Sequence, residues 1–457
     1  MAPRRMCLAP ARALHGQGPS LRKNAEARGF RDGAGRLGCR VQRNAAFLPP
    51  RLSDRLPFVR YFVALMLILL LAACAAPVRR PAVPVGETER ATVLDGLPNA
   101  RFWVDTQTDA LAEEILKALE RERAALGLGA SARLPPADLL SISGGSDDGA
   151  FGAGLLVGWT SAGTRPEFKL VTGISTGALT APFAFLGPAY DDDLRQVYTG
   201  VQPKDIFRLR SYLLVLFGDA LADTQPLFHL ISHYVDERMM AEIAREYEKG
   251  RLLMIGTTDL DVMRPVIWNI GAIAASGNPG ALDLFRRLLL ASAAIPAVFP
   301  PVLIDVQANG RNYQEMHVDG GAVAQLFLYP SSLTLGRNLR SGPLARERHA
   351  YVIRNARLDA GWADVDRRVF TIAGRAISSM IHYSGSNDIL RLQMTTARDG
   401  VDFNLAYIDR GFTVPHTETF EQSYMRALFD YAYGKARQGY PWIKGHPLLL
   451  AAPAAAR

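Results

Sequence analysis

Cysteine is the rarest residue in this chain of 457 residues, with only Cys7, Cys39 and Cys74. Three cysteines exclude a disulfide-rich scaffold, and no cluster of cysteine and histidine has the spacing of a zinc site. The chain also has no calcium-binding loop of the Asp-x-Asp-x-Asp-Gly type. We therefore expect no metal and no cofactor, so that any chemistry has to come from ordinary side chains.

A net excess of positive charge is also missing from most of the chain, although the formal net charge is +8. Residues 1–50 contain ten Lys and Arg against Glu26 and Asp32, which accounts for the whole excess. These basic residues show no periodicity that would gather them on one folded face, so we expect no nucleic-acid partner. We expect residues 1–50 to be either disordered or translated only because the start site was assigned too far upstream.

A long hydrophobic run is absent as well. The apolar stretch of residues 61–76 is 16 residues long, shorter than the roughly 20 that a membrane-spanning helix needs. It follows three arginines between residues 51 and 60 and closes with Leu71-Ala72-Ala73-Cys74, as a secretion signal does. This pattern resembles the signal peptide of bacterial lipoproteins.

The resemblance predicts a signal peptide at residues 51–74, cleavage before Cys74 and lipid attachment to its sulfur. The protein would then be lipid-anchored in the bacterial cell envelope. Ala75 stands where an aspartate would resemble an inner-membrane retention signal, which favours the outer membrane over the inner. An uncleaved helical anchor remains the alternative.

What the chain does contain is Gly-Ile-Ser-Thr-Gly at residues 173–177, between an apolar run and a stretch of small residues. A serine flanked by glycines between a strand and a helix fits a nucleophile elbow, where the tight turn leaves no room for neighbouring side chains. Ser175 is therefore the candidate nucleophile, and Gly173 and Gly177 are the glycines of its motif. The alternative is an ordinary glycine turn with a capping serine.

Two further segments occur in the order that one fold would need. Residues 139–154 run from an apolar strand through Gly144, Gly145 and Ser146 into a helix, and the backbone N–H groups of such a loop suit an oxyanion. Downstream, a short strand ends in Asp319, followed by Gly320 and Gly321.

With these three motifs in this order, the chain resembles the patatin-like phospholipase family over roughly residues 137–357. The segments at residues 256–261 and 291–302 are also similar to the family. The resemblance implies an α/β fold, a catalytic dyad of Ser175 and Asp319, an oxyanion hole at Gly144, Gly145 and Ser146, and no cofactor. It also implies a lipid or phospholipid ester as substrate, cleaved through an acyl-enzyme.

One departure from the family lies in the glycine-rich loop, which commonly carries Arg or Lys where this chain has Asp148. The backbone donors survive this change, but the charge of the cation does not. We expect Asp147 and Asp148 to point away from the site and to interact with the dipole of the following helix. The departure puts a preference for anionic head groups in doubt.

Two alternatives to the dyad stay open. His317 lies two residues before Asp319 in the same strand, so both could face the site and form a Ser-His-Asp esterase. The second alternative is a non-catalytic envelope lipoprotein that binds acyl chains. The acid at Asp148, in place of the usual cation, is the feature in its favour.

The rest of the chain alternates strand and helix patterns, which predicts a three-layer α/β/α domain with a mostly parallel sheet. Residues 75–136 are expected to form a linker and an N-terminal helix, residues 137–357 the hydrolase domain, and residues 358–457 a helical C-terminal extension. This extension either packs onto the core or forms a lid that shapes the substrate site. The predicted strands are 138–143, 168–174, 251–258, 314–318, 350–354 and 401–408, and the predicted helices 109–126, 150–160, 176–186, 191–199, 226–248, 281–294, 366–399 and 417–438.

Overall fold

The structure is a computed structural model that describes residues 60–64, 66, 79–210, 219–333 and 345–450. The chain divides into two units, Met1–Met66 and Leu67–Arg457. In the first unit the described residues, 60–64 and 66, are helical. Among the described residues, no helix is both long and apolar enough to cross a membrane. Cys74 and most of the predicted signal peptide lie outside the described residues.

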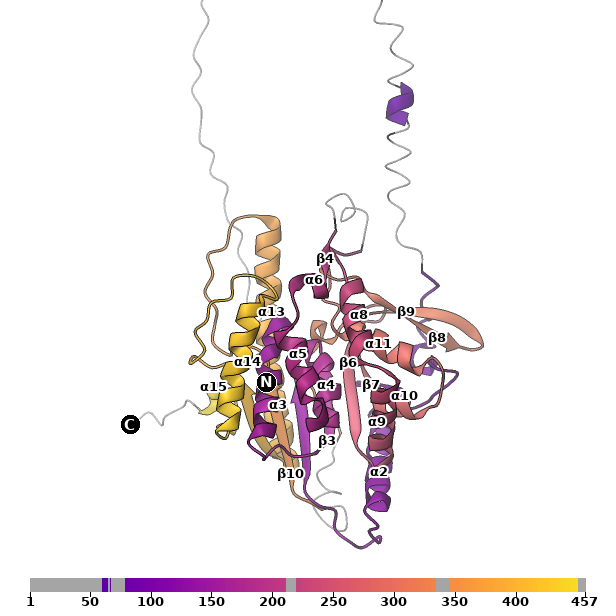
Figure 1. The fold of residues 1–457 in the computed structure, drawn as a ribbon. Coiled ribbons are helices and arrows are strands. Elements are labelled where there is room, and N and C mark those ends of the chain that lie inside the picture. The colour runs from indigo at the N-terminus through magenta and orange to yellow at the C-terminus, as the bar shows by residue number, and fades with distance from the viewer. Residues whose placement is uncertain (1–59, 65, 67–78, 211–218, 334–344, 451–457) are drawn as a thin grey trace, which may run out of the picture. The chain divides into compact units, whose positions relative to one another are not determined.

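The second unit is built on a sheet of nine strands (Figure 1). Five neighbouring strands are parallel: β6 (Leu252–Asp259), β3 (Phe168–Ile174), β2 (Ala137–Ile142), β10 (Arg348–Arg354) and β11 (Asp402–Tyr407). The antiparallel strands are β7 (Arg264–Asn269) and β1 (Arg101–Trp103) beyond β6, and the hairpin of β8 (Val302–Ala308) and β9 (Arg311–Asp319). The mostly parallel sheet confirms the predicted fold class.

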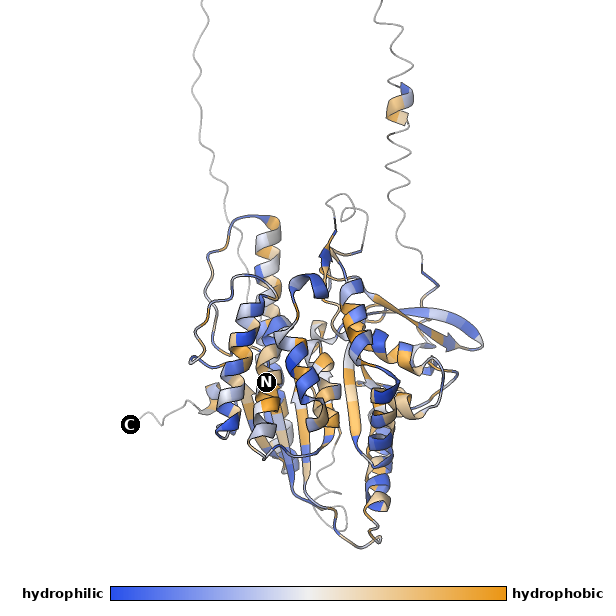
Figure 2. Cartoon of the chain, in the orientation of Figure 1, coloured by the Kyte–Doolittle hydropathy of each residue, from blue (hydrophilic) through white to orange (hydrophobic). Residues whose placement is uncertain are grey.

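Helices cover both faces of this sheet. Alternate side chains divide between the faces, since Leu140 and Ile353 pack into one apolar cluster and Leu139 and Val352 into another. The first face carries α3 (Gly149–Ser161), α4 (Thr176–Leu186), α5 (Asp191–Thr199), α14 (Gln422–Arg437), α8 (Gln225–Tyr234), α9 (Glu237–Glu248) and α11 (Ala281–Ser292). The other face carries α2 (Thr108–Ala125) and α13 (Val369–Asp399). Figure 2 shows hydrophobic residues gathered in the strands and on the inner sides of the helices.

Shorter elements connect this framework. They are α6 (Pro203–Ile206), α10 (Ile270–Ala275), α15 (Pro447–Leu450), a small sheet of β4 (Arg208–Leu209) and β5 (Ala222–Asp223), and four single-turn 3₁₀ helices, η2 (Thr88–Arg90), η3 (Ser146–Asp148), η4 (Pro188–Tyr190) and η5 (Gly320–Ala322).

The structure corrects two expectations from the sequence. The helix expected at residues 226–248 is two helices, α8 and α9, because Asp236 lies between them and caps α9 by accepting a hydrogen bond from the N–H of Met239. The strands β1, β7 and β8 are not among those expected. The strand expected at residues 401–408 is present as β11, which pairs in parallel with β10 and extends the sheet of the hydrolase domain.

The C-terminal extension is packed onto the core through glycines of α3. A Cβ atom added to Gly154 would lie 2.2 Å from the carbonyl oxygen of Phe429 in α14, and one added to Gly158 would lie 2.4 Å from that of Tyr433. The backbones of α3 and α14 can approach this closely only because these positions have no side chain. The small residues of α3 therefore determine where α14 sits.

We expect Gly154→Ala to lower the free energy of unfolding by about 1–3 kcal/mol, because the added methyl group overlaps the backbone of α14. Gly434→Ala in α14 is the matched control, since nothing lies within 4 Å of the Cβ it would add. Removing a helical glycine should raise stability by up to about 1 kcal/mol. Chemical denaturation measures both, and equal effects would contradict the close approach of the two helices.

Candidate active site

Two strands meet end to end along one edge of β6. β3 pairs with β6 as far as Ile174, which lies opposite Gly256. β9 arrives from the opposite direction on β6 and ends with Asp319 opposite Thr257. Ser175 follows directly after β3, so the sheet itself brings the predicted nucleophile and the predicted base to one point. This point is at the carboxyl ends of the parallel strands, where sites in α/β sheets form.

Ser175 adopts a strained backbone, with φ 56° and ψ −127°, a conformation that a non-glycine residue seldom takes. The glycines on both sides are required by contact. A Cβ atom on Gly173 would lie 2.3 Å from the carbonyl oxygen of Gly177, and one on Gly177 would lie 2.2 Å from that of Ile142. The turn thus has the tight geometry of a nucleophile elbow rather than that of an ordinary capping turn.

The elbow is held from behind by Ser292, at the end of α11. Its hydroxyl accepts a hydrogen bond from the N–H of Ser175 at 3.0 Å and donates one to the carbonyl oxygen of Gly256 at 2.7 Å. Ser292 is fully buried. Its hydroxyl therefore joins the strained turn to β6, the strand with which both β3, before Ser175, and β9, which ends in Asp319, are paired.

Asp319 is buried, and burial raises the pKa of its carboxyl to about 6. Hydrogen bonds from the Ser175 hydroxyl and from the N–H of Gly321, which lies 2.7 Å from Oδ1, oppose this rise. At neutral pH the carboxylate is ionised and has an unusually high proton affinity for an aspartate. These are the properties that a general base needs.

The glycine-rich loop lies against Ser175. A Cβ atom on Gly144 would be 3.0 Å from Cβ and 3.6 Å from Oγ of Ser175. Within the part of the chain that the structure describes, the N–H groups of Gly144 and Gly145 have no hydrogen-bond acceptor. Two unused donors beside a serine hydroxyl can bind an oxyanion. Ser146, the third residue of the predicted oxyanion hole, has a positive φ of 55° and lines an apolar pocket beside Ser175.

Asn355, directly after β10, clamps this loop. Its N–H donates to the hydroxyl of Ser143, its side-chain amide donates to the carbonyl oxygen of Ser143, and its Oδ1 accepts from the N–H of Gly152. A Cβ atom on Gly145 would lie 2.0 Å from the carbonyl oxygen of Asn355. The loop therefore rests directly on the backbone at Asn355, and no side chain fits at Gly145.

An apolar pocket opens beside Ser175. It is lined mainly by aliphatic and aromatic residues from α4, α8, the segment between α11 and β8, and the C-terminal extension, among them Leu179, Leu227, Leu230, Phe299, Phe420 and Met425. Such a lining suits a hydrocarbon chain, and the serine lies at its wall. The C-terminal extension is thus both packed on the core and part of the substrate pocket.

The two acidic residues of the loop are bound by the C-terminal extension. Oδ2 of Asp147 accepts from the N–H of Phe420 at 2.7 Å and lies 2.7 Å from Nε2 of His416, and Oδ1 of Asp148 accepts from the hydroxyl of Tyr424 at 2.6 Å. The side chain of Asp148 makes no capping bond to α3. The bond from Tyr424 therefore replaces the expected role of Asp148 at the helix dipole. Asp147, expected to point away from the site, instead lines the pocket beside Ser175 and holds Phe420 as a wall of it.

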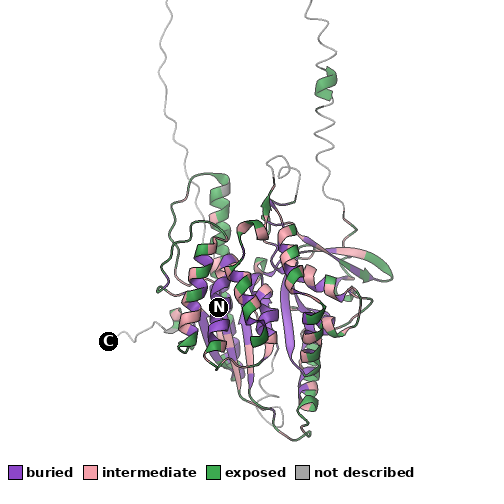
Figure 3. Cartoon of the chain, viewed as in Figure 1, coloured by how far each residue is buried: buried purple, intermediate pink, exposed green. Residues whose placement is uncertain are grey.

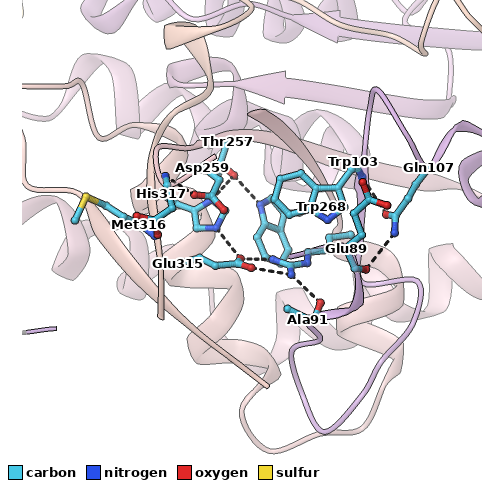
Figure 4. A network of polar contacts seen from close by, with 12 residues as sticks. Glu89, Ala91, Trp103, Gln107, Thr257, Asp259, Trp268, Glu315, Met316 and His317 are labelled. Carbon is cyan, nitrogen blue, oxygen red and sulfur yellow. Dashed lines mark hydrogen bonds and ion pairs between the residues drawn. The ribbon is translucent and has the colours of Figure 1, made fainter. Parts of the chain in front are cut away.

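His317, the alternative base, belongs to a buried network behind the site (Figure 4). Nδ1 lies 3.0 Å from the hydroxyl of Thr257, and Nε2 lies 3.2 Å from the carboxylate of Glu315. The indole of Trp268 can only donate to Thr257, which leaves the threonine hydroxyl free to donate to Nδ1. Nε2 then carries the proton toward Glu315. Neither ring nitrogen is available to take a proton from Ser175.

The same network contains the one group of described residues that could hold a metal ion, Asp259, Glu315 and His317, whose ligand atoms lie within 4.8 Å of one another. Arg101 already forms an ion pair with Glu315. Burial works to raise the pKa of Glu315, but the charge of Arg101 and the hydrogen bonds lower it to about 2. Burial raises the pKa of Asp259. Through these contacts the cluster joins β9 to β1 and β6.

Sequence reasoning missed Ser292, Asn355 and Gln325. The side-chain amide of Gln325 donates to the carbonyl oxygen of Gly321, and its Oε1 would lie 3.1 Å from a Cβ on Gly144, so it joins the turn of the base to the loop. Ser292 lies in the segment 291–302 that resembles the family, but Asn355 and Gln325 lie in no motif with a recognisable spacing. Asn355 directly follows the expected strand at residues 350–354. That position, at the carboxyl end of a parallel strand, is the one sequence signal for its place near Ser175.

Residues 140–329 match the family model described as patatin-like phospholipase. Among solved structures, the chain is similar to VipD from Legionella pneumophila, with 11% identity and a TM-score of 0.32 over 66% of this chain and 67% of that chain. It is also similar to human GIVD cytosolic phospholipase A2, with 10% identity and a TM-score of 0.24 over 62% of this chain and 51% of that chain. No curated protein matches the chain.

The pKa of Asp148 yields a stability prediction. Burial raises it to about 6, against the hydrogen bond from Tyr424. A carboxyl whose pKa is raised on folding stabilises the fold while protonated, and that contribution is lost as the pH rises through about 6. At pH 7 we therefore expect Asp148→Asn to raise the free energy of unfolding by on the order of 2 kcal/mol, with no gain near pH 4.

Denaturation at the two pH values measures this difference. Asp430→Asn, at an exposed position of α14, is the control and should change stability little at either pH. A loss of stability in Asp148→Asn at pH 7 would show that the charged carboxylate is the favoured form in the fold.

Proposed function

Because residues 140–329 carry a domain of the patatin-like phospholipase family, we propose that this protein is a serine hydrolase that cleaves the acyl ester bonds of lipids through an acyl-enzyme. The observation that carries the proposal is the meeting of Ser175 and Asp319 at one edge of β6, beside two unused N–H groups and an apolar pocket. Each of these parts has a separate task in ester cleavage.

In the first half of the reaction, the carboxylate of Asp319 takes the proton of Ser175 as Oγ attacks the acyl carbonyl carbon. The negative charge that develops on the carbonyl oxygen is stabilised by the N–H groups of Gly144 and Gly145, with Ser146 beside them. The acyl chain lies along the apolar pocket. The protonated Asp319 then gives its proton to the leaving alcohol.

In the second half, the same carboxylate removes a proton from water as the water attacks the carbonyl carbon of the acyl-enzyme. The bond to Oγ then breaks, Asp319 returns its proton to Ser175, and the fatty acid is released. A base with a pKa of about 6 suits both halves, because it is ionised at neutral pH and still binds a proton readily. The strained turn holds Oγ at the mouth of the pocket, so little reorganisation precedes the attack.

We expect Ser175→Ala and Asp319→Asn each to lower kcat for a short-chain nitrophenyl ester by roughly 10³-fold or more, with the fold intact. The kcat of the unchanged protein should rise with pH through about 6, as Asp319 loses its proton. His317→Gln is the control for the rival base and should keep kcat within about tenfold, because His317 acts on β9 rather than on Ser175.

An inactive, folded His317→Gln together with a nearly fully active Asp319→Asn would reverse the assignment of the base. An unchanged protein that binds fatty acids but hydrolyses neither soluble esters nor phospholipids would instead favour the acyl-chain binder.

We also propose that the protein is held at the bacterial cell envelope by lipid on Cys74, with the outer membrane favoured over the inner. The proposal is supported by the order of arginines, apolar residues and Leu71-Ala72-Ala73-Cys74 in the sequence. Several acyl chains at one cysteine would give stable anchoring, whereas a single chain binds a membrane only marginally.

We expect mass spectrometry of the membrane-extracted protein to find Cys74 as the lipid-modified first residue. Cys74→Ser should abolish the modification and retain the upstream residues. An N-terminal peptide that begins before an unmodified Cys74 in the unchanged protein would establish the uncleaved helical anchor instead.

A further inference from the structure

The first half of α13 is uncovered, whereas its second half is packed. From Ser386 onward the helix is held by contacts: the hydroxyl of Ser386 lies 2.9 Å from Nε2 of His446, and the carboxylate of Asp388 accepts from the N–H of Gln325. Before this point, residues 371–381 are exposed except for the half-exposed Arg375. Figure 3 shows this end of the helix as an exposed projection.

The uncovered half is amphipathic. At about 100° per residue, its large exposed apolar side chains fall within one half of the helix circumference, and they are Val369, Ile372, Ile377, Met380, Ile381 and Tyr383. The opposite half carries Thr371, Arg375, Ser378, Ser379 and His382. A helix of a soluble domain normally buries such an apolar face against the core, and here the described residues leave it uncovered.

The uncovered half of α13 projects beyond the carboxyl ends of the parallel strands. β10 is parallel to β2 and β3, so its carboxyl end lies on the same side of the sheet as that of β3, which leads to Ser175. The chain then climbs beyond these strand ends to Val369 and turns back down through α13 to the start of β11 (Figure 1). Residues 369–383 therefore extend roughly 20 Å past the end of the packed helix.

We propose that this half of α13 lies in the surface of a phospholipid bilayer and so turns the end of the sheet that carries Ser175 toward it; the proposal rests on the proposed function. An amphipathic helix of this kind binds at the boundary between head groups and acyl chains. Trp362, 90% exposed just before the helix, and Tyr383 are of the residue types that favour this boundary.

The charges of the uncovered half agree with a bilayer surface. Between Val369 and Asn387 the only charged residue is Arg375, so this half carries no acid that lipid phosphates would repel, and Asp364, Asp366, Arg367 and Arg368 precede the helix. Arginine at the rim of an apolar face can reach phosphate groups while its stem stays among apolar groups.

Trp362 provides a direct test. The full chain carrying Ser175→Ala is mixed with phosphatidylcholine and phosphatidylglycerol vesicles whose acyl chains are brominated, which quench tryptophan on contact. Trp103, Trp159 and Trp268 are buried and Trp442 is half-buried, so Trp362 is the one fully exposed indole of the described residues. We expect quenching that Trp362→Phe removes, and quenching that survives this substitution would overturn the proposal.

A second test separates docking from catalysis. In the active protein, the pair Ile372→Asp and Met380→Asp should lower hydrolysis of phospholipid vesicles by about tenfold or more, because two apolar side chains no longer enter the bilayer. Hydrolysis of a soluble nitrophenyl ester should be unchanged. Leu126→Asp is the matched control, since this exposed leucine ends α2 at the opposite edge of the sheet and should affect neither substrate.

If this double variant lost hydrolysis equally on both substrates, or lost no hydrolysis of vesicles, the docking role would be overturned. Self-association of the unchanged protein that Ile372→Asp abolishes would also overturn it, and would assign the face to a second copy. If the unchanged protein hydrolyses neither substrate, the proposed function fails, while the quenching of Trp362 still decides whether the helix meets the bilayer.

Discussion

The edge of β6 that faces β3 is occupied by two strands in succession, and the rest of the site depends on this arrangement. β3 leaves the edge at Ile174 because the chain turns into the elbow, and β9 takes up the next positions and ends at Asp319. Ser175 and Asp319 are thus positioned by backbone pairing rather than by long side chains. A carboxylate as short as that of aspartate can reach the serine only because the two strand ends nearly touch.

This arrangement costs free energy at several points. The backbone at Ser175 stores on the order of 1–3 kcal/mol of strain, and Asp319 is kept in a buried place that disfavours its charge. Ser292 offsets part of this by satisfying the N–H of the strained residue, and Asn355 satisfies the loop in front of it. The ion pair of Arg101 and Glu315 holds β9 from the far side. Buried polar contacts therefore surround the elbow where apolar packing alone would not fix it.

Much of the fold could be predicted from the sequence, because the five parallel strands are short apolar runs that alternate with helical patterns. The missed strands lack that signal: β1 has three residues, β7 contains Pro265, and β8 is recognisable mainly through its pairing with β9. The motif residues of the candidate site are local in sequence, since a glycine turn needs its own neighbours. Ser292 and Asn355 act across 117 and 212 residues, so no local pattern could reveal them.

The acid in the glycine-rich loop shows how a sequence departure can be explained only by tertiary contacts. In isolation, Asp147 and Asp148 look unfavourable beside a site that must stabilise negative charge. In the fold, both carboxylates accept hydrogen bonds from the C-terminal extension, and the buried Asp148 has its pKa raised to about 6. The two acids thereby anchor the segment that contributes Phe420 to the pocket, so that the glycine-rich loop and the pocket wall are held as one unit.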